Sequence, residues 1–184
     1  AAEADVRAAL ADHAFAILRP PAIYGPFDAA TKPLFDAFRR GLAPRIGRKG
    51  SRVAMIHVDD AARAALAAAA AADPAGPVFE VDDGAVGHSW DAIHAAAAAA
   101  RGQRLLPAPI GPALIRIGGA LGSAAARLGL GAPFLTAGKA REILAGDWLV
   151  DPSRRPPDWS PEVSLQSGFS HTLACYRERR QRAS

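Results

Sequence analysis

Sulfur-containing side chains are nearly absent from this 184-residue chain. Cys175 is the single cysteine, so no internal disulfide can form, and the sequence predicts a reducing, cytoplasmic location. Met55 is the single methionine, so we expect that residue 1 is not the natural translation start. The opening residues read as helix interior with no capping residue before them, which predicts a fragment or a processed product.

Long uncharged apolar runs are also missing. The longest apolar stretch, residues 110–135, is interrupted by Arg116 and Arg127, so no transmembrane helix is expected, and no signal peptide opens the chain. One alternative stays open, in which residues 112–128 and the arginine-rich C-terminus attach the protein to a membrane surface.

The formal net charge is +4, and much of the basic excess collects near the C-terminus, at Arg177, Arg179, Arg180 and Arg182. Basic side chains near a helix C-terminus interact favourably with its dipole. No aromatic residues alternate with these arginines, as a base-stacking platform would need. The sequence therefore predicts a solvated helix end and no nucleic-acid partner.

Several catalytic and binding motifs are missing. There is no G-x-x-x-x-G-K-[ST] loop, and no nucleophile elbow surrounds Ser89. Gly129-Leu130-Gly131 begins a G-x-G-x-x-G pattern, but Phe134 replaces its last glycine. The five histidines share no metal-ligand spacing, so no metal site is predicted. No catalytic residue is assigned.

The pattern that is present alternates short apolar strands with alanine-rich helices. Strands are expected at residues 15–19, 52–58 and 78–81, and helices dominate later in the chain. This order predicts an α/β fold with a parallel sheet and a helical annex. We expect one region over residues 1–103, in which residues 20–55 contribute to the substrate side, and a mainly helical substrate-binding region over residues 104–184.

Smaller signals place the ends of these elements. Thr31, Ser89 and Thr136 are expected to be helix N-caps. Leu165, Phe169, Leu173 and Tyr176 fall at helical spacing and predict one apolar stripe on the last helix.

Two strand exits are the candidate site, because open α/β sheets bind ligands beyond the carboxyl ends of their strands. The first is AILRPPAIYGPFD, residues 16–28, where Tyr24-Gly25 is expected to turn the chain after a buried strand. The second is MIHVDDA, residues 55–61, where Asp59 and Asp60 suit helix capping better than acid–base catalysis. His57 is either packed in the core or a ligand contact, and Arg52 is either an anion clamp or part of an exposed basic loop.

These segments resemble the extended short-chain dehydrogenase/reductase family, the NAD-dependent epimerase/dehydratases. The resemblance rests on Ile17-Leu18-Arg19-Pro20, Ile23-Tyr24-Gly25-Pro26 and Ile56-His57-Val58-Asp59-Asp60-Ala61. Later matches follow in the family's order, at residues 78–81, at Ser89-Trp90 and over residues 147–169. The resemblance implies the C-terminal part of a Rossmann-type parallel sheet with a mainly helical substrate-binding annex.

The family's glycine-rich turn and Tyr-x-x-x-Lys pair are not in this sequence. The resemblance implies NAD or NADP as cofactor, with Pro20, Pro21, Ala22, Ile23 and Tyr24 on the nicotinamide side. It implies Tyr24, Arg52 and His57 on the substrate side. Ala22 stands where sugar-nucleotide members carry asparagine, and the apolar residues 110–135 favour a less polar substrate.

The resulting prediction is the substrate-binding half of an NAD(P)-dependent oxidoreductase or epimerase that is inactive alone. Its partners would be the missing N-terminal half of the same protein and a small-molecule substrate of apolar character, and a homodimer is left open. The alternative is a non-catalytic binding or assembly subunit with the same fold.

Overall fold

The computed structural model describes residues 2–47, 50–131 and 135–181. Phe134, Arg182 and the side chains of Arg179 and Arg180 lie outside the described residues. The elements follow the order α1 Ala2–Ala9, β1 Ile17–Arg19, β2 Ala22–Tyr24, α2 Lys32–Arg39, β3 Leu42–Arg45, β4 Arg52–Val53, β5 Met55–His57, α3 Val58–Ala70, β6 Val78–Glu80, β7 His88–Ser89, α4 Trp90–Arg101, β8 Leu106–Pro109, α5 Pro112–Arg127, α6 Ala137–Leu144, η1 Pro152–Arg154 and α7 Leu165–Gln181. The chain is therefore a mixed α/β structure in which helices prevail toward the C-terminus, as predicted.

The strands form four two-stranded pairs. β1–β6, β2–β5 and β3–β8 are parallel, and β4–β7 is antiparallel. Pro20 and Pro21 separate β1 from β2, and the chain changes its partner from β6 to β5 at this point. The predicted parallel α/β class is confirmed, although the strands are shorter than one continuous sheet would have.

One strand position differs from the sequence prediction, and one strand pair was not predicted. Tyr24 was expected in a turn, but it ends strand β2 and pairs in register with His57. Residues 42–45 form β3, which pairs with β8 at residues 106–109. β3 and β8 both contain proline, which lacks a backbone donor and which a strand tolerates where only one side is paired.

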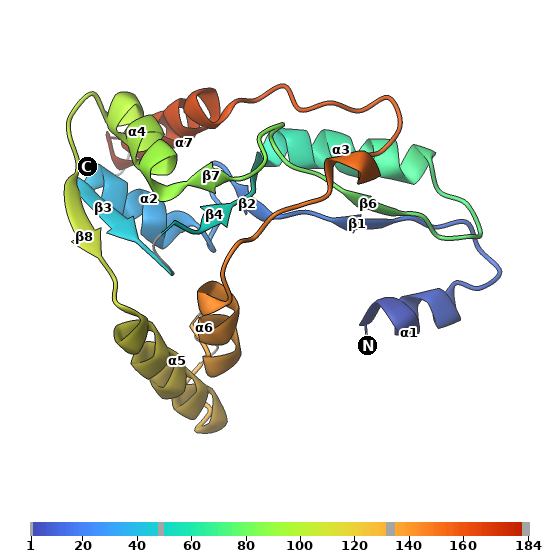
Figure 1. The fold of residues 1–184 in the computed structure, drawn as a ribbon, viewed down its shortest axis with the longest axis horizontal. Helices are drawn as coiled ribbons and strands as arrows, with labels where there is room; N and C mark the ends of the chain where they lie inside the picture. The colour runs from blue at the N-terminus through green and yellow to red at the C-terminus, as the bar shows by residue number, and fades with distance from the viewer. Residues whose placement is uncertain (1, 48–49, 132–134, 182–184) are drawn as a thin grey trace.

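The main core lies where α2, α4 and α7 pack together (Figure 1). Phe35 and Phe38 of α2 and Ile93 of α4 are almost fully buried there. The predicted stripe on α7 completes this core, and all four of its members are buried, Leu165, Phe169, Leu173 and Tyr176. A second, smaller core joins β5 and the following helix α3 through Ile56, Ala61 and Ala64.

Two of the three predicted N-cap residues make the expected side-chain hydrogen bond, and the third does not. Ser89 accepts a hydrogen bond from the Ala92 backbone N–H, and Thr136 accepts one from that of Lys139, so both predictions are confirmed. Thr31 occupies the N-cap position of α2 but makes no side-chain cap hydrogen bond. Instead, Asp28 Oδ2 accepts a hydrogen bond from the Thr31 backbone N–H at 2.6 Å.

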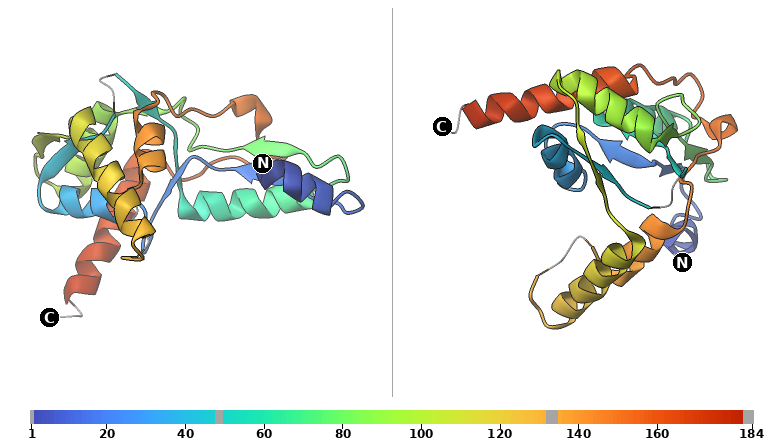
Figure 2. Two further views of the ribbon diagram at one scale, coloured as in Figure 1. Left: turned by 90° about the horizontal axis from the view of Figure 1, so that it is seen from below. Right: turned by 60° about the vertical axis from the view of Figure 1, so that its left-hand side comes forward.

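Helices α5 and α6 pack against each other as a hairpin that projects from the rest of the molecule (Figures 1 and 2). The packing needs small residues, because a methyl group added at Gly119 would meet the Ala140 side chain and the Thr136 carbonyl. Among the described helices, none combines the length and the apolar character needed to cross a bilayer.

Candidate functional site

Tyr24 and His57 bring the two predicted strand exits together. They end the parallel strands β2 and β5 and are register partners, so both strands finish at the same edge. The predicted juxtaposition of the two segments is therefore present in the fold. Their side chains, however, point into the protein, with exposed fractions of 0% for Tyr24 and 1% for His57.

The Tyr24 ring is enclosed by other aromatic rings. Its centroid lies 5.1 Å from that of Phe169, 5.5 Å from that of His57 and 6.1 Å from that of Phe35. Burial raises the pKa of the Tyr24 hydroxyl strongly, and the negative charges of Asp83 and Asp60 raise it further. Tyr24 therefore stays protonated at neutral pH, and the whole residue is closed off from solvent.

His57 is the N-cap of α3. Its Nδ1 accepts a hydrogen bond from the Asp59 backbone N–H at 3.3 Å, which the sequence reasoning had expected an aspartate to do. Burial lowers the pKa of His57, and His171 lowers it further, against the opposing charges of Asp59 and Asp60. The imidazole is thus kept neutral, as an accepting Nδ1 requires.

The lowered pKa of His57 predicts a pH-dependent stability. The unfolded chain takes up a proton near pH 6.5, whereas the folded chain does so only at lower pH. The free energy of unfolding should therefore fall as the pH drops from about 7.5 to about 5.5. The variant His57→Asn keeps an N-cap acceptor without this titration, so it should show a smaller fall.

Urea denaturation at the two pH values measures this effect. The exposed histidine variant His13→Asn is the matched control and should keep the pH dependence of the parent. Equal pH dependence in the parent and in His57→Asn would contradict the assignment.

His57, Asp59 and His171 also offer ligand atoms within 4.8 Å of one another. His57 and Asp59 are two residues apart, but His171 lies on α7, so no sequence spacing could have joined it to them. Nδ1 of His57 lies 3.3 Å from Asp59 Oδ2 and already accepts the hydrogen bond that caps α3. A metal ion bound through Nδ1 would have to replace that hydrogen bond. The sequence-based expectation that the chain holds no metal site stays a prediction.

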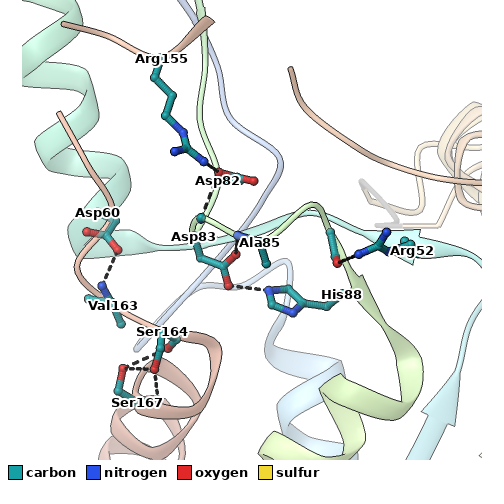
Figure 3. Close-up of polar contacts among 12 residues, drawn as sticks. Arg52, Asp60, Asp82, Asp83, Ala85, His88, Arg155, Val163, Ser164 and Ser167 are labelled. Atoms are coloured by element: carbon teal, nitrogen blue, oxygen red, sulfur yellow. Dashed lines mark hydrogen bonds and ion pairs between the residues drawn. The ribbon is translucent and has the colours of Figure 1, made fainter. Parts of the chain in front are cut away.

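Asp60 ties the C-terminal segment to α3 (Figure 3). Its carboxylate is fully buried and accepts hydrogen bonds from the backbone N–H groups of Glu162, at 3.0 Å, and Val163, at 2.9 Å. Arg63, one turn later on the same helix, forms an ion pair with it. The capping role expected for Asp59 and Asp60 belongs to His57, and Asp60 instead anchors a segment that is distant in sequence.

A second polar network holds the loop between β6 and β7 (Figure 3). Asp82 forms an ion pair with Arg155 at 2.6 Å, and Asp83 Oδ2 lies 2.6 Å from His88 Nε2. Both carboxylates are buried, and each also accepts a backbone N–H from its own loop. This network fixes the loop against η1 and β7.

Arg52 is exposed and turned toward this loop. One guanidinium nitrogen donates to the Gly87 carbonyl at 3.0 Å (Figure 3). Its backbone is bound on the other side by Asp147 and Trp148. Arg52 therefore lies apart from the buried Tyr24–His57 pair, and its predicted substrate contact stays a prediction.

The segment that leads into β2 is the accessible part of the first strand exit. Pro20 is exposed, and Pro21, Ala22 and Ile23 are half-buried. Ile23 packs on the small core beside Ile56. The nicotinamide contact expected for these residues stays a prediction.

Two clefts of about 500 Å³ each flank α4 on the side of β3 and β8. They share Arg45, Asp91 and Pro109, and the Arg45 guanidinium forms an ion pair with the Asp91 carboxylate. The remaining lining of the first cleft is largely alanine, proline and leucine. The sequence reasoning assigned neither Arg45 nor Asp91, because no local signal joins two residues that meet only through the β3–β8 pairing.

Sequence comparison finds one informative relative, and no family model matches the chain. A ceramide reductase of Caulobacter vibrioides is 38% identical over 96% of this chain and 55% of its own length. The chain thus spans about half the length of the curated relative that it matches.

Solved structures show the same fold. Human epimerase family protein SDR39U1, solved with NADPH, superposes with a TM-score of 0.63 and 19% identity, over 86% of this chain and 48% of its own. UDP-glucose 4-epimerase of Thermotoga maritima, solved with UDP-glucose, gives 0.61 and 18%, over 91% of this chain and 47% of its own.

The resemblance to the extended short-chain dehydrogenase/reductases inferred from the strand-exit segments is confirmed, and so is the fold class, the C-terminal part of a Rossmann-type domain. The proteins matched are named as one reductase and two epimerase-type proteins.

Proposed function

We propose that this chain is the substrate-side half of an NAD(P)-dependent reductase that acts on a ketone of a ceramide-like lipid. The observation that carries the proposal is the 38% identity to a ceramide reductase over nearly the whole chain. The apolar clefts beside α4 support it, because alanine, proline and leucine walls suit a hydrocarbon chain better than a sugar.

The bound dinucleotide would supply hydride to the carbonyl carbon, while a proton reaches the oxygen, so that a secondary alcohol and NAD(P)+ result. The residues at Pro20–Ile23 would offer their open apolar surface to the nicotinamide ring. The neighbouring Tyr24 and His57 would hold that strand in place from beneath rather than move protons, because both side chains are closed off from solvent. Arg45 and Asp91 would orient the polar end of the lipid at the point where the two clefts meet.

The acid–base pair and the phosphate-binding turn would come from polypeptide outside these 184 residues, since the sequence holds neither motif. The chain by itself should therefore not oxidise NADH or NADPH. A longer protein that also carries the family's N-terminal half should do so when a keto form of a ceramide-type lipid is present in mixed micelles.

The test compares both proteins by nicotinamide absorbance, with each cofactor. UDP-glucose serves as the contrasting substrate and should not be epimerised. Lipid-independent oxidation, or epimerisation of the sugar nucleotide, would contradict the proposal. Cofactor binding with no turnover of either substrate would instead favour the non-catalytic assembly subunit.

A further inference from the structure

The α5–α6 hairpin carries an apolar surface that no described residue covers. Leu114, Ile117, Leu121 and Leu128 are exposed to 63%, 57%, 67% and 74%. The first three lie on one face of α5, since residues three, four and seven apart share a helix face, and Leu128, the C-cap residue, continues the same spacing. We define these four residues as the α5 stripe.

The α5 stripe is not needed for packing within the hairpin. α5 meets α6 through its opposite face, where Ile115 and Gly119 are buried and Ser123 Oγ accepts a hydrogen bond from the Ala137 backbone N–H. α5 is thus apolar on two faces, of which α6 covers only one. Exposed apolar surfaces of this kind mark sites of association.

The charges on α5 itself have one sign. This helix carries Arg116 and Arg127 and no aspartate or glutamate, and α6 carries Lys139, Arg141 and Glu142, of which Lys139 and Glu142 form an ion pair. Arg116 and Arg127 lie on α5 itself and are exposed, and neither makes an ion pair with a described residue. An apolar face with basic neighbours is the pattern of helices that lie in an anionic membrane interface.

We propose that the α5 stripe docks on the surface of an anionic lipid bilayer, with the projecting hairpin as the inserted element. The hairpin stands away from the body of the chain, so it can reach a flat surface without a change of fold (Figure 2). α5 lies in the interface and does not cross the bilayer, which agrees with the absence of a spanning helix among the described residues. The inference stands without the proposed reductase activity, but with it the hairpin would bring the clefts to a membrane-borne lipid.

Vesicle flotation tests the proposal, and it uses the full-length protein that includes this chain. The probes are phosphatidylcholine vesicles with and without phosphatidylglycerol, at low and at high salt, without cofactor or substrate. Binding should require the anionic lipid and should fall at high salt, because screening weakens the attraction of Arg116 and Arg127. The double variant Arg116→Gln with Arg127→Gln should lower partitioning about thirtyfold.

The matched apolar variants are Leu121→Gln on the α5 stripe and Leu66→Gln on α3, whose side chains are both largely exposed. Leu121→Gln should weaken flotation severalfold and Leu66→Gln should not. The triple variant Leu114→Gln, Ile117→Gln and Leu121→Gln should abolish it while the circular dichroism spectrum stays unchanged.

Three results would overturn the inference. They are no binding of the parent to any vesicle, equal loss in Leu121→Gln and Leu66→Gln, and a triple variant that floats normally but changes the oligomeric state in light scattering. The last result would mean that a second copy of the chain covers the stripe. A negative reductase assay would not change how any of these three results is interpreted, so the two proposals can be refuted separately.

Discussion

Asp60→Ala is expected to destabilise the protein by at least about 3 kcal/mol. The substitution removes a fully buried carboxylate and leaves the backbone N–H groups of Glu162 and Val163 without their acceptor. It also removes the carboxylate with which Arg63 forms an ion pair on α3. Because the N–H groups belong to the segment that leads into α7, the loss should loosen the C-terminal helix as well as α3.

The free energy of unfolding from urea titration measures the effect, and limited proteolysis between residues 156 and 164 reports on the loosened segment. Asp60→Asn retains one acceptor oxygen and should fall between the parent and Asp60→Ala. Asp59→Asn is the matched control, because its side chain is 58% exposed and its loss should cost no more than about 0.5 kcal/mol. Similar losses for Asp60→Ala and Asp59→Asn would show that the buried anchor does not act as described.

Gly168→Ala should give the second largest effect, a loss of about 1–3 kcal/mol. Gly168 lies on α7 against the Tyr24 side chain, and a methyl group there would overlap the Tyr24 hydroxyl oxygen and lie 3.0 Å from the nearest ring carbons. The enclosed Tyr24 ring cannot move aside without displacing Phe35 or Phe169. The helix or the strand must therefore shift.

A double-mutant cycle with Tyr24→Phe separates this clash from a simple helix effect. Removing the hydroxyl takes away the closest overlap, so Gly168→Ala should cost clearly less in the Tyr24→Phe background. Gly138→Ala on α6 is the control. Its added methyl group would come no closer than 3.8 Å to Thr136 Oγ1, so alanine should be neutral or slightly stabilising there. Additive losses at Gly168 and Tyr24 would refute the contact.

The sequence could locate the elements whose signals are local. The stripe on α7, the caps Ser89 and Thr136, and the strands that begin at Ile17 and Val78 follow from side-chain periodicity and capping chemistry alone. The family resemblance also used the order of these elements along the chain. Together, the local signals and this order were enough to predict the fold class.

The remaining features depend on contacts between distant segments. β2 follows two prolines and precedes Tyr24-Gly25-Pro26, so its composition predicts a loop, and only the pairing with β5 makes it a strand. β3 and β8 acquire strand geometry from each other despite their prolines. His57 as a cap and Asp60 as an anchor were missed because aspartate is the commoner cap and because Glu162 and Val163 lie far away in sequence. The Arg45–Asp91 ion pair was missed for the same reason, since these two residues are also distant in sequence.

The core joins the first and the last parts of the chain. Tyr24, Phe35 and Phe38 are covered by Phe169 and Tyr176, which lie far later along the chain. Until α7 has been synthesised, these rings lack the partners that cover them in the fold, and exposed apolar surface of this kind attracts chaperones. We therefore expect a variant truncated before residue 165 to aggregate or be degraded rather than to form a smaller stable domain.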